Sequence, residues 1–341
     1  MSISIKVKSI LANSLSYSGQ IDRLIAKKSN TKFLILMYHR IIPYKEAGPG
    51  LQAGMYVEPE TFKMHLMYLK NRFNIMPLSW LIGQIKYDAR LNYNKPTCFI
   101  TFDDGWLDFY KYAYPILVEH KVPVTVFLPT KFIGTDDWFW TDSITKIFVD
   151  INNNNIKSMR IPSGGIIEKI INYKGSLDDK IENAISTLKK YREEYIYDSI
   201  MELESILKSS PVKKDRLFFN WDEAREMAES SIVTFGSHTY SHKILTNLNE
   251  SEVLEELYEA KTKLIDEKAV DGSFIPFCYP NGNYDERIMR LIKSAGHDVS
   301  VTTESGWNDV DTCLLKLKRA PIHQDIASTI GMFGCRLINI L

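Results

Sequence analysis

The sequence predicts an α/β fold with a mostly parallel sheet that closes toward a barrel. Six apolar runs of four to seven residues lack polar alternation, which is typical of strands buried on both faces. Helical patterns lie between most of these runs, as in a parallel sheet with crossover helices. Polar residues suited to catalysis directly follow four of the runs. A barrel brings such strand ends together better than an open sheet does.

The predicted strands are short and apolar throughout. The first lies in KFLILMYHR, where residues 33–38 are apolar and the polar pair His39 and Arg40 ends the run. The expected strands cover residues 33–38, 97–102, 123–128, 232–235, 273–279 and 299–302.

The helices between these strands have recognisable ends. Asn220 followed by Glu223 is a variant of the capping box, so we expect a helix to begin there. Gly296 stops the last of these helices. The other helices are expected over residues 59–72, 108–120, 251–268 and 285–295.

The barrel is expected to span residues 32–325, interrupted by a helical insertion at residues 136–219. Within the insertion, Ile181, Ile185 and Leu188 recur at helical spacing in a charged stretch, which predicts one or two helices. The asparagine run at residues 152–155 is expected to be a loop tip.

Two end segments flank the barrel. Residues 1–31 form a basic amphipathic segment with five Lys or Arg residues and one Asp, and residues 326–341 form an apolar segment. Each is expected either to pack on the barrel or to lie at a membrane surface.

Composition excludes several classes of protein. The 341 residues hold 42 Lys and Arg and 42 Asp and Glu, so the basic surplus of a general nucleic-acid binder is missing. No apolar run is long enough to span a membrane, and the first residues lack a signal-peptide pattern. The four cysteines form no C-x-x-C pair, so we expect reduced thiols. We therefore expect a cytoplasmic protein, peripheral at the inner membrane surface if its ends bind lipid.

The segment SHTYSH contains two histidines four residues apart, His238 and His242. This spacing places both imidazoles on one face of a helix or helical turn, where they can reach one metal ion. Such a pair alone is a weak signal, because many are ordinary surface residues.

The segment TFDDG adds two adjacent carboxylates, Asp103 and Asp104, at the end of an expected strand. Burying both is costly unless a cation lies nearby. One Asp with two His leaves a fourth metal position open for water, as in catalytic zinc sites, and the other Asp is then free to act as a base. The alternative is that the pair caps the following helix.

TFDDG and SHTYSH resemble the first two motifs of the polysaccharide deacetylase family, the NodB-homology domain of carbohydrate esterase family 4. LMYHRI, FCYPNG and a late LKR segment fit the same family in their order, over roughly residues 32–324 apart from the insertion. The resemblance implies a distorted (β/α) barrel, here with a helical insertion, that removes acetyl groups from N-acetylated sugars.

The resemblance also assigns roles. Asp103 matches the general base, and Asp104, His238 and His242 match the three metal ligands. The ligand types favour Zn²⁺, although Co²⁺, Ni²⁺ or Fe²⁺ fits the same set.

The third motif departs from the family pattern. Cys278 stands where many members have the arginine that steadies the base, and Arg319, grouped with the substrate-side residues, is the candidate to hold Asp103 instead. The general acid is expected to be His323 or its competitor His39.

The remaining candidates face the substrate. The backbone amide of Asn281 is the expected oxyanion donor. Tyr279 and Trp307 are expected either to stack on a sugar ring or to lie in the core.

The predicted function is hydrolysis of the N-acetyl amide of an amino sugar, with metal-activated water and an Asp base. The substrate is an N-acetylated saccharide or a lipid-linked or nucleotide-linked precursor of a surface polysaccharide. Three alternatives stay open: a deformylase or deacylase of a lipid-linked amino sugar, a catalytically silent carbohydrate-binding relative, and a membrane-associated interaction protein.

Overall fold

The computed structural model describes residues 3–28, 32–48, 50–86, 95–153, 165–207 and 215–340. The chain forms two compact units. The first comprises Met1–Tyr44, Ala53–Thr135 and Phe218–Leu341, and the second comprises Lys45–Gln52 and Asp136–Leu217. The second unit thus includes a short segment near residue 50 that was expected, from the sequence, to belong to the barrel.

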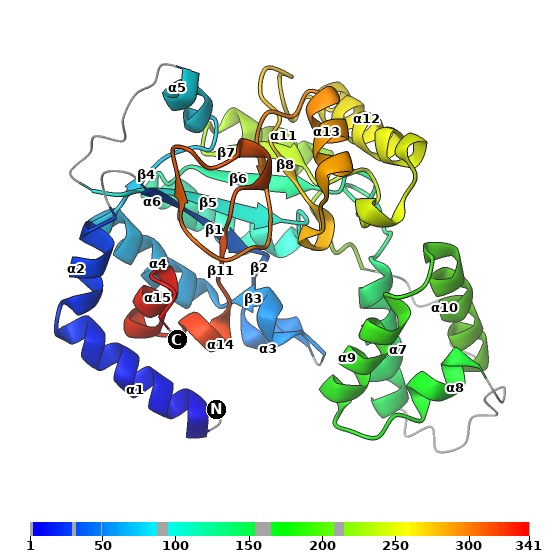
Figure 1. The fold of residues 1–341 in the computed structure, drawn as a ribbon. Helices are drawn as coiled ribbons and strands as arrows, with labels where there is room; N and C mark the ends of the chain where they lie inside the picture. The colour runs from blue at the N-terminus through cyan, green and yellow to red at the C-terminus, as the bar shows by residue number, and fades with distance from the viewer. Residues whose placement is uncertain are drawn as a thin grey trace. The chain divides into compact units, whose positions relative to one another are not determined.

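Within the described residues, the first unit holds a nine-stranded sheet in the order β10–β1–β5–β6–β7–β8–β9, with β4 pairing β5 and β11 pairing β1 (Figure 1). All pairs in this sheet are parallel except β1 with β10. The strands are β1 (Lys32–Tyr38), β4 (Asn74–Ile75), β5 (Thr97–Asp103), β6 (Val124–Leu128), β7 (Val233–Ser237), β8 (Phe277–Cys278), β9 (Ser300–Val301), β10 (Asn308–Asp309) and β11 (Ala320–Pro321); a separate ladder joins β2 (Arg40–Ile41) and β3 (Tyr56–Val57).

The segment that ends in β11 closes the sheet into a ring. Leu317 bridges Val301 of β9 in parallel, and its amide donates to the Ser300 carbonyl at 3.0 Å. Three residues later, Ala320 pairs with Leu36 of β1. Because this one segment pairs first with β9 and then with β1, the sheet is the distorted barrel that the sequence predicted.

All six expected strands are present, although β8 and β9 cover only two residues each of the expected ranges 273–279 and 299–302. Every residue of β5 is buried, as predicted for a strand covered on both faces. Full burial of each large apolar side chain contributes about 1.5–3 kcal/mol to stability. One core cluster joins the strands around β5: Phe33, Ile35, Leu78, Leu81, Phe99, Phe127, Cys278, Val299, Val301 and Leu317.

Most helices of the barrel begin and end within a residue or two of their expected bounds. The capping box at Asn220 is formed, since the Asn220 and Glu223 side chains each accept the other's backbone amide, at 2.9 and 2.6 Å. The helices are α4 (Pro59–Arg72), α5 (Trp80–Lys86), α6 (Tyr114–His120), α11 (Trp221–Glu229), α12 (Glu250–Asp266) and α13 (Glu286–Ser294). The short helix α3 (Tyr44–Ala47) begins at the last residue before the second unit and continues into it.

The helix expected at residues 108–120 is not regular. A π-helical turn, Phe109–Ala113, precedes α6. Pro115 lies in the first turn of α6. Because proline has no N–H to donate, it cannot continue the preceding hydrogen-bond pattern, and the helix changes form there.

The insertion contains four helices among its described residues, more than the one or two expected. They are α7 (Trp140–Asn153), α8 (Ile166–Ile171), α9 (Leu177–Leu188) and α10 (Glu193–Leu207). Ile181, Ile185 and Leu188 face their shared apolar core, as their spacing predicted. Residues 154 and 155 of the expected asparagine loop lie outside the described residues.

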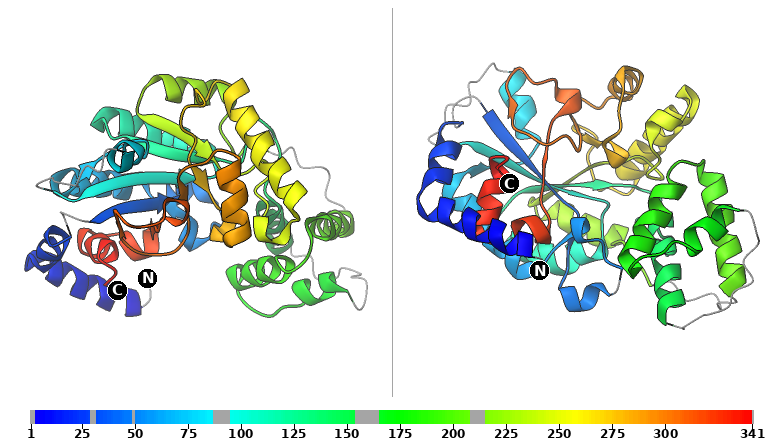
Figure 2. Two further views of the ribbon diagram at one scale, coloured as in Figure 1. Left: turned by 45° about the horizontal axis from the view of Figure 1, so that its top comes forward. Right: turned by 60° about the horizontal axis from the view of Figure 1, so that its bottom comes forward.

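Both chain ends pack in the first unit, where α1 (Ile3–Tyr17) runs along α15 (Ile330–Leu337) (Figure 2). The Asn13 side chain accepts hydrogen bonds from the Gly331 amide and the Thr329 hydroxyl, both at 3.2 Å. Short helices α2 (Gln20–Ala26) and α14 (Gln324–Ala327) complete the ends. Among the described residues, no helix combines the length and apolarity needed to cross a membrane.

Acid stability is expected to depend on His65, a buried residue of α4 away from the strand ends. Its ring stacks on Phe333, bonds the Ala327 carbonyl at 2.7 Å, and lies 3.1 Å from the Tyr38 hydroxyl. Burial lowers the pKa of His65 to about 4, although the bond to Ala327 opposes this shift. The unfolded chain, with a histidine pKa of about 6.5, binds more protons between these values.

Stability from His65 is therefore full above about pH 6.5 and is lost as the pH falls through about 4, a change of about 3 kcal/mol. We expect the free energy of unfolding of the metal-free His65→Gln variant to change less between pH 7 and about pH 4 than that of metal-free wild type. Urea unfolding of both proteins at the two pH values measures this difference. Equal pH dependence in the two proteins would contradict the assignment.

Candidate active site

The candidate site lies where several parallel strands end. Asp103 is the last residue of β5, His39 follows β1, His238 follows β7, and Cys278 ends β8. Arg319 directly precedes β11. Because these strands run in the same direction, their carboxyl ends form one edge of the barrel.

Asp104, His238 and His242 form a cluster that can hold a metal ion. Asp104 Oδ1 lies 3.6 Å from Nε2 of each histidine, and the three ligand atoms lie within 4.8 Å of one another. Ligand atoms held about 2.1 Å from one tetrahedral ion lie roughly 3.4 Å apart. The donor types and their spacing therefore fit a divalent metal, with a fourth position available to water or substrate.

Neighbouring groups orient these ligands. The Cys278 carbonyl lies 2.8 Å from His238 Nδ1, so that nitrogen carries the proton, and the lone pair of Nε2 is left available to a metal ion beside Asp104. Trp106 Nε1 donates to Asp104 Oδ2 at 3.0 Å, which turns Oδ1 toward the histidines. Burial lowers the pKa of His238 against the opposing charge of Asp103, and a neutral imidazole is the form that binds metal.

The two histidines do not lie on a helix, so that expectation was wrong. They lie in an irregular loop in which Thr239 and His242 adopt left-handed backbone angles, φ 68° and 64°. The Thr239 hydroxyl accepts the His242 amide at 2.9 Å, and this turn brings the two rings together. Asp104 is also left-handed, with φ 77°. Left-handed backbone at non-glycine residues costs about 1–3 kcal/mol each and is typical of functional sites.

Buried Glu256 on α12 holds this loop in place. Its carboxylate accepts hydrogen bonds from the Ser241 amide, at 2.8 Å, and from the Ser241 hydroxyl. Its backbone carbonyl accepts the Tyr240 amide at 3.1 Å, and Lys243 Nζ lies 3.7 Å from its Oε1. Glu256 was not predicted from the sequence, although a carboxylate on the same face as Val253 was an available signal.

Asp103 is held by Arg319. The guanidinium bonds both carboxylate oxygens, at 2.7 and 2.8 Å, and also bonds the Thr302 carbonyl and the Thr101 hydroxyl. Burial alone raises the pKa of Asp103, but the charge and hydrogen bonds of Arg319 hold that pKa well below its usual range. Asp103 is therefore ionised, as a general base must be.

Arg319 holds Asp103, as the sequence suggested for a chain with cysteine at position 278. The Cys278 thiol lies 3.2 Å from Arg319 Nη2 and 3.6 Å from Asp103 Oδ2. Because Arg319 is 0% exposed, its grouping with the substrate-side residues was wrong. It acts on Asp103 from within the barrel.

His39 lies beside Asp103, and the charge of His323 also acts on His39. Nε2 of His39 is 3.9 Å from Asp103 Oδ2. Burial lowers the pKa of His39 to about 4, with the charge of Asp103 opposing the shift. His323 Nδ1 contacts Asp325, and within the described residues no hydrogen bond or ion pair joins His323 to Asp103.

A second ion pair fixes the chain next to His39. Arg40 donates to Asp108 at 2.7 Å, and the other Asp108 oxygen accepts the Ile41 amide at 3.1 Å. The Arg40 guanidinium also lies over the Trp106 ring, 4.6 Å from its centre. Arg40 therefore connects the segment that carries His39 to the one that carries Asp104.

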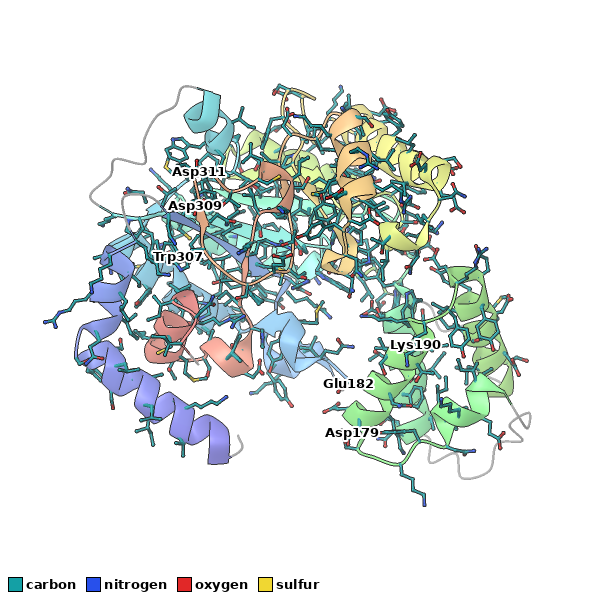
Figure 3. All side chains as sticks on the ribbon, in the orientation of Figure 1. Asp179, Glu182, Lys190, Trp307, Asp309 and Asp311 are labelled. Atoms are coloured by element: carbon teal, nitrogen blue, oxygen red, sulfur yellow. The ribbon has the colours of Figure 1, made fainter. Side chains whose placement is uncertain are left out.

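Tyr279 lies in the core, whereas Trp307 is only partly buried, at the amino end of β1. Tyr279 is buried, and its hydroxyl donates to the Leu315 carbonyl at 2.7 Å. Trp307, labelled in Figure 3, directly precedes β10. Because β10 pairs with the amino end of β1, Trp307 lies at the opposite edge from the carboxyl strand ends that carry the site. Its indole donates to the Leu337 carbonyl at 2.7 Å. Asn281 lies in the turn just after β8, exposed and with φ 55°.

Buried Asp103 and the Asp104–His238–His242 cluster thus lie together at the strand ends of the barrel. The family model described as polysaccharide deacetylase matches residues 90–300, and the chain belongs to this family. It is thus classed with the enzymes that hydrolyse carbon–nitrogen amide bonds other than peptide bonds.

Related proteins support the fold assignment. YxkH of Bacillus subtilis (strain 168), named as a candidate polysaccharide deacetylase, is 22% identical over 306 residues, 89% of this chain and 76% of that protein. The deacetylase PplD of Streptococcus pyogenes, solved in complex with acetate, matches with TM-score 0.56 and 19% identity over 87% of this chain and 95% of its own. IcaB of Ammonifex degensii matches with TM-score 0.56 and 16% identity, covering 90% and 98% of the two chains.

The Arg319–Asp103 pair is expected to show strong coupling in a double-mutant cycle. Arg319→Met leaves Asp103 buried without its partner and should destabilise the protein by about 3–5 kcal/mol. Adding Asp103→Asn removes the lone charge and should recover part of that loss. Urea unfolding of the four proteins measures the coupling, and additive losses would contradict it.

Glu256 is expected to support metal affinity through the loop. Glu256→Gln should weaken Zn²⁺ binding by about tenfold or more, because it loosens the histidine loop. Glu259→Gln, an exposed change on the same helix, is the matched control. Calorimetric titration of metal-free protein measures the affinity, and unfolding of metal-free protein measures stability. Lower stability with unchanged affinity would show that Glu256 serves the fold alone.

Proposed function

We propose that this protein is a metal-dependent N-deacetylase of amino sugars in a polysaccharide or its precursor. The observation that carries the proposal is the Asp104–His238–His242 cluster beside an ionised Asp103, in a chain of the polysaccharide deacetylase family. The full ligand set and the Arg319-held base support an active enzyme over a silent carbohydrate-binding relative.

Asp104, His238 and His242 would hold the metal. Two imidazoles and one carboxylate favour Zn²⁺, and Co²⁺, Ni²⁺ or Fe²⁺ suits the same donors. When bound, such an ion lowers the pKa of water and polarises the acyl carbonyl.

The chain's own residues supply the proton transfers. Asp103 takes a proton from the attacking water as the water oxygen bonds to the acyl carbon. The Asn281 amide, in the turn after β8, is the proposed donor to the developing oxyanion. The C–N bond then breaks, and His39, 3.9 Å from Asp103, carries the balancing proton to the amine nitrogen. The products are acetate and a free amino sugar.

The proposal is tested by metal content and acetate release measured on the same samples. We expect wild type and the control His120→Ala to bind one metal ion per chain and to release acetate, and His238→Ala to lose both. The substrates are N-acetylated oligosaccharides and lipid-linked or nucleotide-linked N-acetyl sugars. Bound metal with release of formate instead would keep the chemistry and change the acyl group. No metal binding after reconstitution with Zn²⁺ or Co²⁺ would refute the proposal.

The general acid is distinguished by two matched substitutions. His39→Gln should lower kcat by about 10²–10⁴-fold, because it removes the proton carrier beside Asp103. His323→Gln should change kcat by only a few-fold, and both variants should retain the metal. Steady-state kinetics with the best substrate measures the effect, and the reverse order of losses would make His323 the acid.

A further inference from the structure

Helix α1 exposes its large apolar side chains and packs through a small one. Val7, Ile10 and Leu11 are 51%, 66% and 54% exposed, whereas Ala12 is 0% exposed. Residues spaced three and four apart lie on one face of a helix, so the three exposed side chains form one stripe. In a helix that serves only the fold, such a stripe faces the core.

The close approach of α1 to α15 fixes this orientation. A Cβ atom at Gly331 would lie 2.5 Å from the Ala12 carbonyl carbon and from the Asn13 amide nitrogen. The Asn13 side chain bonds the Gly331 amide from the same face. Only a helix face with a small residue such as Ala12 can approach Gly331 this closely. If α1 turned its apolar stripe toward α15, this close contact between the two helices would be lost.

Basic residues outnumber acidic ones in this part of the chain. Residues 1–30 hold five Lys or Arg and one Asp, while the whole chain has equal numbers of acidic and basic residues. The one acid, Asp22, is paired with Arg72 at 2.6 Å. Lys8 on α1 is exposed, as are Arg23 on α2 and Lys27 just after α2.

We propose that the exposed stripe of α1, comprising Val7, Ile10 and Leu11, binds an anionic lipid surface. Apolar side chains enter the boundary between headgroups and acyl chains, and nearby Lys and Arg residues are attracted to anionic headgroups. A second copy of the chain fits less well, because pairing two copies through α1 would bring together two segments of net positive charge. The inference does not depend on the deacetylation reaction.

The test is flotation of the full chain with vesicles of phosphatidylcholine containing about one third phosphatidylglycerol. We expect wild type to float with these vesicles and not with pure phosphatidylcholine, and raised salt to weaken the binding. Ile10→Ser/Leu11→Ser should lower the partition coefficient by about tenfold or more. Tyr258→Ser/Ile265→Ser, which removes two exposed apolar side chains from acidic α12, should bind as wild type does.

Several outcomes would overturn the proposal. The proposal fails if wild type does not float with the anionic vesicles, or if the α1 variant floats as well as wild type. It also fails if light scattering shows that wild type is a dimer and that the α1 variant is a monomer. If the double variant does not fold, Lys8→Glu/Lys27→Glu replaces it, and unchanged binding to anionic vesicles would count against the proposal.

Discussion

The buried pair of Arg319 and Asp103 is the interaction on which the rest of the structure depends. Arg319 belongs to the segment that closes the barrel between β9 and β1, and Asp103 ends β5 on the far side of β1. Two buried charges are stable only when they satisfy each other and their remaining hydrogen bonds, and Arg319 does so through Asp103, Thr101 and Thr302. The contact that completes the barrel thus also keeps the base ionised.

A layer of fixed polar contacts surrounds the metal-ligand cluster. Asp104 and His242 both have left-handed backbone, which persists only where the surroundings determine it. Trp106, the Cys278 carbonyl and Glu256 come from three different segments, and each restrains one ligand or the loop that carries it. The strain and the restraints together describe a site whose geometry is set before a ligand arrives.

The sequence was sufficient where the signal was local. Continuous apolar runs predicted the main strands, and the polar residues at the carboxyl end of each run predicted which side chains meet at the barrel edge. The sequence was insufficient where the position of a side chain depends on its direction or on contacts with residues far away in the chain. Arg319 meets Asp103 across 216 residues of chain, Tyr279 turns into the core although it belongs to the FCYPNG segment, and Trp307 lies at the opposite barrel edge. A spacing of four predicted a helical turn at His238 and His242, but hydrogen bonds to Thr239 and Glu256 impose a different loop.

The central claim is that Asp104, His238 and His242 bind one catalytic metal ion while Asp103 stays free as the base. A second group of donors, Asp103, His238 and Cys278, lies close enough to compete. X-ray absorption at the zinc edge, on metal-free protein loaded with one equivalent of Zn²⁺, separates the two. An ion on Asp104 and the two histidines has nitrogen and oxygen ligands alone, at about 2.0–2.2 Å, with the scattering of two imidazoles, and this is the predicted result. A sulfur ligand at about 2.3 Å would place the ion on Cys278 and contradict the claim.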